Sequence, residues 1–358
     1  MRVTGIRARA HRLPLHRAWD GGVDRNDIVV VEVDTDTGLT GTGFSWTPLI
    51  GARAVHALIE DDLRPALLGG PAHPSRWDEL RHHLREAGTT GLTLMALAAV
   101  DIALWDLTAK AAELPLVDLL GRQRETVPAY GSGVNLDYPL PDLQDQVRGW
   151  LTAGHHAVKI KVGSPDTERD TRRVHAVRTL IGPDRLLMID ANQRWDVPTA
   201  ARTLTALAPH DPHFIEEPLP AADLRAHIRL RSRTPIPFAL GENLRTIEEF
   251  ERYIDAGACD IAQPNIIRVG GITPFLRIAE TAARRGVPVA PHLLPELSGQ
   301  LALCLSRPAM VEDIDRASFA ALGALAAPSG VRVERGALSA NTGLGHGVVF
   351  ADTLTPLP

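Results

Sequence analysis

Short apolar runs alternate with amphipathic stretches along most of the chain after residue 126. The runs are typical of buried β-strands, and the stretches between them place apolar residues at helical spacing, as at Val174, Val177 and Leu180. Successive runs start about 20 to 30 residues apart, which leaves room for one strand, one helix and two loops. The runs cover residues 127–131, 157–162, 186–190, 213–217, 238–242, 260–264, 287–292 and 310–315.

A series of such units is typical of a parallel α/β barrel. Eight units that close on themselves form a TIM barrel, and an open, doubly wound sheet is the alternative. Polar residues stand late in many of the runs, as Asp190 and Glu216 do. A TIM barrel collects its active-site residues at that end of its strands, so the pattern favours an α/β barrel over residues 126–335.

The first 125 residues follow a different pattern. Residues 28–34 and 40–46 read as strands around a Thr-Asp-Thr-Gly turn signal, which predicts a β-hairpin. Helical stretches follow at 51–66, 76–87 and 92–112, the last of them mostly apolar but carrying Asp101 and Asp106. We therefore predict a separate, small α+β domain over residues 1–125.

Composition narrows the class of protein. The chain has 38 basic and 43 acidic residues and a net charge of −5 without a long block of one sign, so we expect neither nucleic acid nor a membrane as the main partner. Its two cysteines, Cys259 and Cys304, cannot build a disulfide framework. We see no signal peptide and no uncharged apolar stretch long enough to span a bilayer, and we expect a cytoplasmic protein.

Three acids close successive strand runs at equal spacing. Asp190, Glu216 and Glu242 follow one another at intervals of 26 residues. On neighbouring barrel strands they would meet at one rim, where three negative charges raise one another's pKa unless a cation lies among them. Oxygen ligands without Cys or His select a hard ion, Mg²⁺ before Mn²⁺. The alternative is that single acids of this set cap the helices that follow them.

Two lysines stand together on the preceding run. Lys159 and Lys161 share one side of a strand, while Ile160 points to the other side, so both ammonium groups would face the barrel mouth. Neighbouring positive charges lower each other's pKa, which would make one lysine a usable base near neutral pH. The alternative is a pair of lysines on an exposed edge.

The last two runs add a histidine and a further acid. His292 ends the run at 287–292, and Glu312 lies in the run at 310–315. The three acids, the lysine pair and the histidine together suggest one chemistry. A metal binds a substrate carboxylate and stabilises the enediolate that forms when a lysine removes the α-proton, and the histidine on the opposite face returns or donates a proton.

These residues resemble the mandelate racemase subgroup of the enolase superfamily across essentially the whole chain. Each motif is weak alone, but their order and spacing are specific. The matching segments are Lys-Ile-Lys at 159–161, Asp-Ala-Asn-Gln at 190–193, Ile-Glu-Glu-Pro at 215–218, Gly-Glu-Asn at 241–243, Val-Gly-Gly at 269–271, Pro-His at 291–292 and the helix at 99–107.

The resemblance implies a modified TIM barrel of the (β/α)₇β type, an N-terminal capping domain, and a C-terminal segment at 336–358 that returns to the cap. It implies Mg²⁺ held by the three acids, with Lys161 as a base that Lys159 tunes. It also implies a small carboxylate substrate and a homo-oligomer, from dimer to octamer.

The resemblance assigns further roles around the metal. His292 would be the opposite acid or base, Glu312 would hydrogen-bond the substrate carboxylate, and Asn192 would contact the substrate. One position departs from the subgroup, which usually orients its histidine with an aspartate. Here that position is Asn265, unless a different strand register supplies Asp260 or Asp313 instead.

An amide can orient an imidazole but cannot stabilise its protonated form as a carboxylate does. His292 should therefore be a poor base toward carbon, which favours dehydration of a sugar acid or cycloisomerisation of its lactone. A racemase or epimerase of a 2-hydroxy acid or acyl amino acid is the alternative. A non-catalytic barrel that binds a carboxylate is a third possibility, which the intact acids and lysines disfavour.

We expect specificity to come from the cap. Residues 15–22 combine a flexible diglycine with His16, Arg17 and Trp19, and Trp46 follows the hairpin turn. This segment is predicted to be a mobile lid whose polar residues suit a polyhydroxylated acid. The alternative is a surface loop with an incidental tryptophan.

Overall fold

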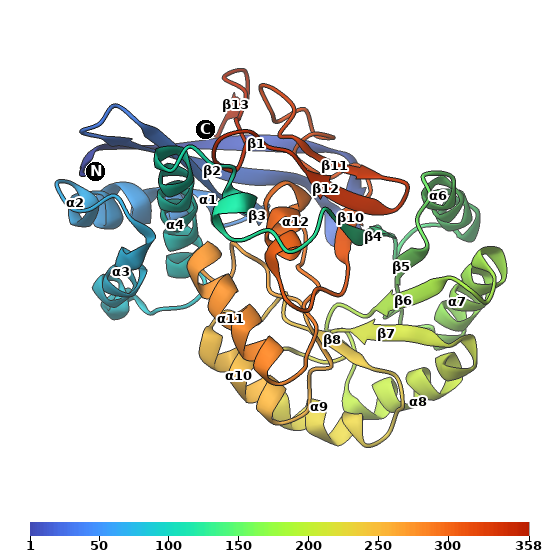
Figure 1. Cartoon of the computed structure of the whole chain (residues 1–358). Coiled ribbons are helices and arrows are strands. Elements are labelled where there is room, and N and C mark those ends of the chain that lie inside the picture. Colours follow the sequence, from blue (N-terminus) through green and yellow to red (C-terminus); the bar gives the residue numbers. More distant parts are fainter. Residues whose placement is uncertain (358) are drawn as a thin grey trace.

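The computed structural model describes residues 1–357. In this part of the chain, four strands form a cap sheet in the order β13-β1-β2-β3, and a larger mixed sheet closes into a barrel. Helices of the barrel lie around its outside, and the cap sheet lies across one end of it (Figure 1). The predicted α/β barrel with an N-terminal cap is confirmed.

The cap begins with a long hairpin. Strand β1 (Val3–Trp19) pairs antiparallel with β2 (Val23–Thr35), which pairs with β3 (Thr40–Pro48), so the predicted hairpin at 28–34 and 40–46 is confirmed. Residues 15–19, part of the segment predicted to be a mobile lid, belong to β1. Only the turn at Asp20–Gly22 remains outside the strands, with Gly21 and Gly22 in the left-handed region. The regular pairing of β1 with β2 extends to Pro14–Arg25 and resumes at Trp19–Val23 after an irregularity, so only the end of this segment is paired.

Helix α4 (Leu92–Ala111) connects the cap to the barrel. It packs closely on β3, where Gly41 and Gly43 leave no room for a Cβ against the α4 backbone. On its other side, the buried Asp101 accepts hydrogen bonds from Thr273 N at 2.8 Å and Thr273 Oγ1 at 2.6 Å. Thr273 lies at the start of barrel helix α11 (Ile272–Arg284), so α4 supplies the cap that the first turn of α11 lacks on its own chain.

Helix α4 is also long and apolar enough to cross a bilayer by length and composition. However, 83% of its most apolar window is buried inside the molecule, as in the core helix of a globular domain. The other cap helices are α1 (Ala52–Ala57), a π-helical turn at Leu58–Leu63, α2 (Arg64–Leu67) and α3 (Trp77–His83).

The barrel strands largely follow the predicted runs. They are β4 (Thr126–Ser132), β5 (Ala157–Lys161), β6 (Leu186–Asp190), β7 (Pro212–Glu216), β8 (Phe238–Leu240), β9 (Ile261–Ala262) and β10 (Val311–Ile314). Adjacent strands are parallel, and β10 pairs with β4 to close the ring.

The run predicted at 287–292 differs. Within this described segment only Val289 pairs, through isolated bridges to Ala262 and Pro308. Pro288 and Pro291 have no N–H to donate, which limits a regular ladder here.

Helices follow the barrel strands and cover them from outside. They are α6 (Leu140–Thr152), α7 (Thr167–Ile181), α8 (Val197–Leu207), α9 (Leu224–Arg231), α10 (Ile247–Asp255), α11 and α12 (Pro295–Cys304), and the short α5 (Leu116–Leu119) precedes β4. Asp166 caps α7 by accepting from Arg169 N, as expected for a helix that starts there. Apolar side chains from successive strands, among them Tyr130, Met188 and Phe214, fill the barrel interior below the rim.

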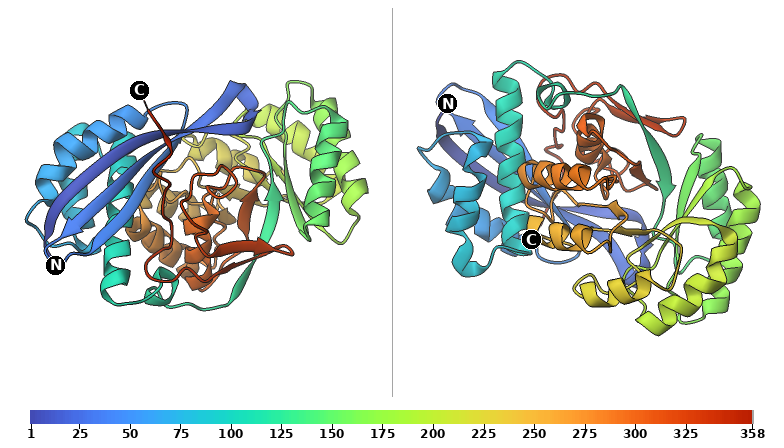
Figure 2. Two further views of the ribbon diagram at one scale, coloured as in Figure 1. Left: turned by 90° about the horizontal axis from the view of Figure 1, so that it is seen from above. Right: turned by 60° about the horizontal axis from the view of Figure 1, so that its bottom comes forward.

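The chain after β10 returns to both sheets. Strands β11 (Val331–Glu334) and β12 (Ala337–Ala340) form a hairpin, and β12 pairs antiparallel with β4. Strand β13 (Thr355–Pro356) then pairs with β1 in the cap. Figure 2 shows this last part of the chain running alongside the cap strands. The cap sheet therefore contains strands from both ends of the sequence.

Candidate active site

The parallel ladder sets three functional groups side by side. Lys161 on β5 is the direct partner of Asp190 on β6, and Asp190 is the direct partner of Glu216 on β7. All three are buried at the carboxyl end of their strands. Lys159 lies one inward position below Lys161, and Ile160 between them packs into the core on the outer side. The strand alternation expected for this lysine pair is observed.

Lys159 is a buried cation that joins two strands. Its Nζ lies 2.7 Å from Glu216 Oε2 and 2.9 Å from Glu312 Oε1. Burial opposes its charge, but the negative charges of Glu216 and Glu312 outweigh burial and hold its pKa well above the usual value. Lys159 is therefore a fixed positive charge in the floor of the site.

Lys161 forms an ion pair with Asp190. Burial and the neighbouring Lys159 both lower the pKa of Lys161, but Asp190 outweighs them and the pKa is raised. Mutual repulsion of the lysines, expected to make a usable base, is thus present but smaller than the attraction of Asp190. A further positive charge beside Asp190 would weaken this attraction and so lower the pKa of Lys161.

Glu216 and Glu242 approach each other at the rim together with His292. One ligand atom of each lies within 4.8 Å of the other two. Asp190, predicted as the third ligand, forms an ion pair with Lys161 through one of its oxygens, and His292 Nε2 lies 3.0 Å from Glu242 Oε2. Glu242 follows β8, where Gly241 adopts a φ of 144° that a side chain rarely takes.

The carboxylates at this rim fit a hard cation. Within residues 1–357, the buried Glu216 Oε1 has no hydrogen-bond partner. Burial and then the charge of Asp190 raise the pKa of Glu216 well above its usual value. Crowded, incompletely satisfied oxygens of this kind are what Mg²⁺ or Mn²⁺ binds in proteins.

His292 contacts Asn265, as the sequence suggested. The Asn265 amide nitrogen lies 2.9 Å from His292 Nδ1. The Asn265 oxygen accepts from the backbone N–H of Ile267 at 3.0 Å and of Arg268 at 3.1 Å, which fixes the orientation of the amide. The amide therefore donates to Nδ1, and the proton of the neutral imidazole lies on Nε2, toward the site.

Glu312 is surrounded by donors. Lys159 and Ser132 Oγ (2.6 Å) bond one oxygen, and the N–H of Leu293 bonds the other at 3.1 Å. Burial raises its pKa, but Lys159 and His292 together lower it to about 2. The hydrogen bond from Glu312 to a substrate carboxylate, which the resemblance implies, stays a prediction. In this structure it holds Lys159 in place.

Several polar residues of the site were not singled out from the sequence. Gln263 Nε2 donates to Glu216 Oε2 at 2.7 Å, and Asn135 Oδ1 accepts from Lys161 N at 2.9 Å. Arg268 Nη1 lies 2.9 Å from the Glu242 carbonyl oxygen and 3.3 Å from Glu242 Oε1. Gln263 follows β9, so the rule that polar residues at strand ends face the site would have found it.

A cavity of about 270 Å³ opens above these groups. The barrel contributes Lys161, Asn192, Glu242, His292 and Glu312 to its lining, among other residues. The cap contributes Trp19 and Trp46, whose ring centroids are 6.4 Å apart. Of the cap residues predicted to contact substrate, Trp19 therefore reaches this cavity.

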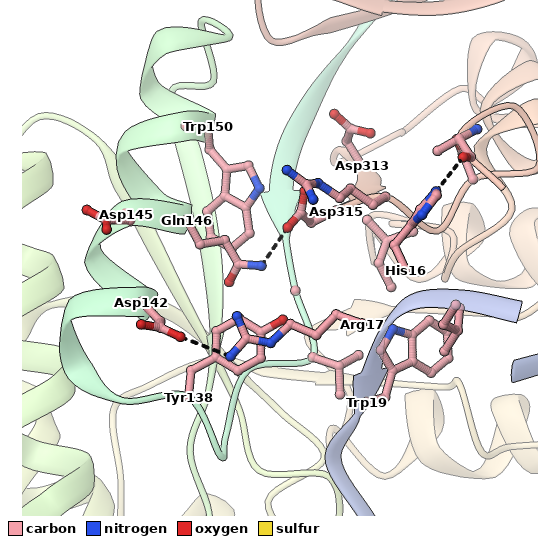
Figure 3. Close-up of a pocket in the computed structure, with 18 of the residues that line it drawn as sticks. His16, Arg17, Trp19, Tyr138, Asp142, Asp145, Gln146, Trp150, Asp313 and Asp315 are labelled. Carbon is pink, nitrogen blue, oxygen red and sulfur yellow. Dashed lines mark hydrogen bonds and ion pairs between the residues drawn. The ribbon is translucent and has the colours of Figure 1, made fainter. Parts of the chain in front are cut away.

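His16 and Arg17 lie elsewhere. They line a neighbouring cavity of about 590 Å³, which shares Trp19, Val134 and Ile314 with the first one. Figure 3 shows Arg17 over the ring of Tyr138, 3.5 Å from its centroid, with its Nη2 3.0 Å from Asp142. His16 bonds the Ala321 carbonyl at 2.9 Å. These contacts fasten the tip of the cap hairpin to the barrel.

Fold and site together define a class: an α/β-barrel enzyme whose strand ends collect lysines, carboxylates and a histidine under a capping domain. Residues 2–121 match the family model of the mandelate racemase / muconate lactonizing enzyme N-terminal domain, and residues 142–354 match the enolase C-terminal domain-like model. The chain belongs to the mandelate racemase / muconate lactonizing enzyme family of the enolase superfamily.

Its relatives are isomerases and lyases. The chain is 34% identical to 3,6-anhydro-alpha-L-galactonate cycloisomerase of Streptomyces coelicolor, with 97% of both chains covered. It is 38% identical to L-talarate/galactarate dehydratase of Salmonella typhimurium, over 75% of this chain and 68% of the relative. The structure of L-talarate dehydratase from Polaromonas sp. JS666, complexed with Mg and L-glucarate, superposes with a TM-score of 0.90 at 35% identity, covering 99% of this chain and 96% of that one.

Proposed function

We propose that this chain is a Mg²⁺-dependent enzyme that removes the proton α to the carboxylate of a sugar acid or its lactone, leading to dehydration or cycloisomerisation. The observation that carries the proposal is the shared row of Lys161, Asp190 and Glu216 on three adjacent strands, with Lys161 and His292 lining one cavity. The named substrates of the relatives support the substrate class.

Asp190, Glu216 and Glu242 would hold the Mg²⁺, with Mn²⁺ as the alternative ion. The unpartnered Glu216 Oε1, within the described residues, supports this assignment. When bound, the ion supplies a Lewis acid for the substrate carboxylate and positive charge that offsets the charge of Asp190. Lys159 and Gln263 keep Glu216 oriented from below.

Lys161 is the base and His292 the acid in this proposal. Lys161 takes the α-proton, and the electron pair of that C–H bond expels the oxygen on the neighbouring carbon. His292 gives its Nε2 proton to the departing oxygen, and Asn265 is the positioning residue that keeps the proton on that nitrogen. Asn192 and Trp19, which also line the cavity, would contact the substrate.

The contact between Asn265 and His292 disfavours a racemase. It would need His292 to abstract a proton from carbon, and the Asn265 amide offers no negative charge to stabilise the resulting imidazolium. A non-catalytic binder is disfavoured because a binding site has no use for a lysine paired with the acids at this position.

The test is proton chemistry in D₂O with Mg²⁺ and a panel of sugar acids and lactones, followed by NMR and a keto-acid assay. Wild-type protein should form product or incorporate deuterium α to the carboxylate. The Lys161→Ala variant should lose both. As a matched control, Lys161→Arg keeps a charge beside Asp190 but cannot give up its proton near neutral pH, so it too should be inactive. Turnover that survives in either variant would refute Lys161 as the base.

We also propose that the enzyme works in the cytoplasm and as a homo-oligomer. Within the described residues both cysteines are free thiols, which suits a reducing compartment. Light scattering coupled to size-exclusion chromatography measures the number of subunits directly.

A further inference from the structure

The loop after β6 is strained and firmly held. Asn192 and Gln193 have φ values of 42° and 63°, a left-handed conformation that side chains seldom adopt at two successive positions. Asn192 N donates to Asp190 Oδ1 at 2.8 Å, and Gln193 N donates to the Glu217 carbonyl at 2.8 Å. Gln193 Oε1 accepts from Ala221 N at 2.6 Å. Strain that is maintained by several hydrogen bonds is typical of functional positions.

The strained turn directs Arg194 to a defined place. A Cβ at Gly163 would lie 2.9 Å from Arg194 Cδ and 3.2 Å from Arg194 Cβ, so the stem of the arginine rests on this glycine. Gly163 has a φ of 104°, which also favours glycine. It follows Lys161 by two residues, at most about 7 Å along the chain. Arg194 and Lys161 line the same cavity.

Arg194 is a free cation in the lining of the site cavity. Its side chain is exposed, and no hydrogen-bond or ion-pair partner lies near its guanidinium among residues 1–357. The other lysine and arginine that line the cavity are occupied, Lys161 by Asp190 and Arg268 by Glu242. Of the lysine and arginine side chains in this lining, only Arg194 is therefore left to bind an anion without first giving up a partner within the described residues.

We propose that Arg194 binds the second carboxylate of a dicarboxylate sugar acid, so that the preferred substrate is a diacid and not the corresponding monoacid. This inference rests on the proposed function, in which the first carboxylate lies at the metal. A guanidinium binds a carboxylate through two parallel hydrogen bonds, which gives both affinity and orientation.

The experiment compares two pairs of acids, galactarate with galactonate and glucarate with gluconate. Each pair differs only at C6, which is a carboxylate in the first member and a hydroxymethyl group in the second. Kinetics are measured for wild type, Arg194→Gln, and the control Arg229→Gln, whose exposed arginine lies on the outer helix α9. Wild type should prefer the diacid. Arg194→Gln should lower kcat/KM for the diacid about 10- to 100-fold and leave the monoacid within about twofold, while Arg229→Gln should change neither.

The outcomes separate this inference from the proposed function. If wild type prefers the monoacids, or if Arg194→Gln lowers both members of a pair equally, the role of Arg194 is overturned while the proposed function stands. If wild type neither exchanges nor transforms any acid of a broad panel, the proposed function fails and this inference fails with it.

Discussion

Replacing Asp101 tests how a buried acid joins the cap to the barrel. Asp101 is 1% exposed, and burial raises its pKa to about 7 despite the two hydrogen bonds from Thr273. Between the ordinary pKa of about 4 and this value, the folded state holds a proton that the unfolded state has released. The protein therefore loses stability as pH rises through that window, and the loss is complete somewhat above pH 7.

The expected magnitude follows from the size of the shift. From pH 5 to pH 8, about two pH units lie below the folded pKa, and each contributes about 1.4 kcal/mol, so Asp101 alone should lower the free energy of unfolding by about 3 kcal/mol. Asp101→Asn resembles the protonated acid and does not titrate. Asp101→Ala also removes the cap of α11 and should cost a further 1–2 kcal/mol or so at both pH values.

Urea unfolding at pH 5 and pH 8 measures these quantities. All variants share the other titrating groups. The decisive quantity is therefore how much more unfolding free energy wild type loses between pH 5 and pH 8 than Asp101→Asn loses. If both proteins lose the same stability between pH 5 and pH 8, Asp101 is ionised in the folded state and the reasoning is refuted.

Three further substitutions examine the site. Lys159→Met leaves Glu216 and Glu312 without their shared cation, so unfolding in urea without metal should show a loss of about 3–5 kcal/mol, and an unchanged midpoint would contradict this. Asn265→Asp puts a carboxylate at His292 Nδ1 and should raise proton exchange from the His292 face at least about tenfold, measured as epimer formation in D₂O. Exchange equal to wild type would show that the Asn265 amide does not limit His292 as a base. Glu242→Gln should weaken Mg²⁺ binding at least about tenfold by calorimetry, and unaltered affinity would exclude Glu242 as a ligand.

The strand-borne part of the site was predictable because it depends on local rules. Alternation along β5 places Lys159 and Lys161 on one side, and the equal spacing of Asp190, Glu216 and Glu242 reflects one acid per βα unit. Both features need only the geometry of a strand and the repeat of the barrel.

Other features depend on contacts that a single segment does not contain. The pKa of Lys161 is decided by Asp190 from the next strand, which reverses the direction expected from the lysine pair alone. The destinations of His16 and Arg17 are set by how the hairpin docks on α6 and on the segment after β10. The irregular pairing at 287–292 follows from Pro288 and Pro291, which cannot donate backbone hydrogen bonds. The apolar pattern of this run predicts a strand and does not account for the missing donors.

The row of Lys161, Asp190 and Glu216 has a consequence for how this molecule can change. Its spacing is set by backbone hydrogen bonds between strands, about 4.8 Å per step, and no loop participates in it. Trp19 and Arg194, in contrast, are placed by a hairpin end and a turn. With the roles proposed for Trp19 and Arg194, insertions or exchanges in those two segments would change which acid is bound while Lys161, Asp190 and Glu216 keep their places, so these segments are the targets we would choose for engineering new selectivity.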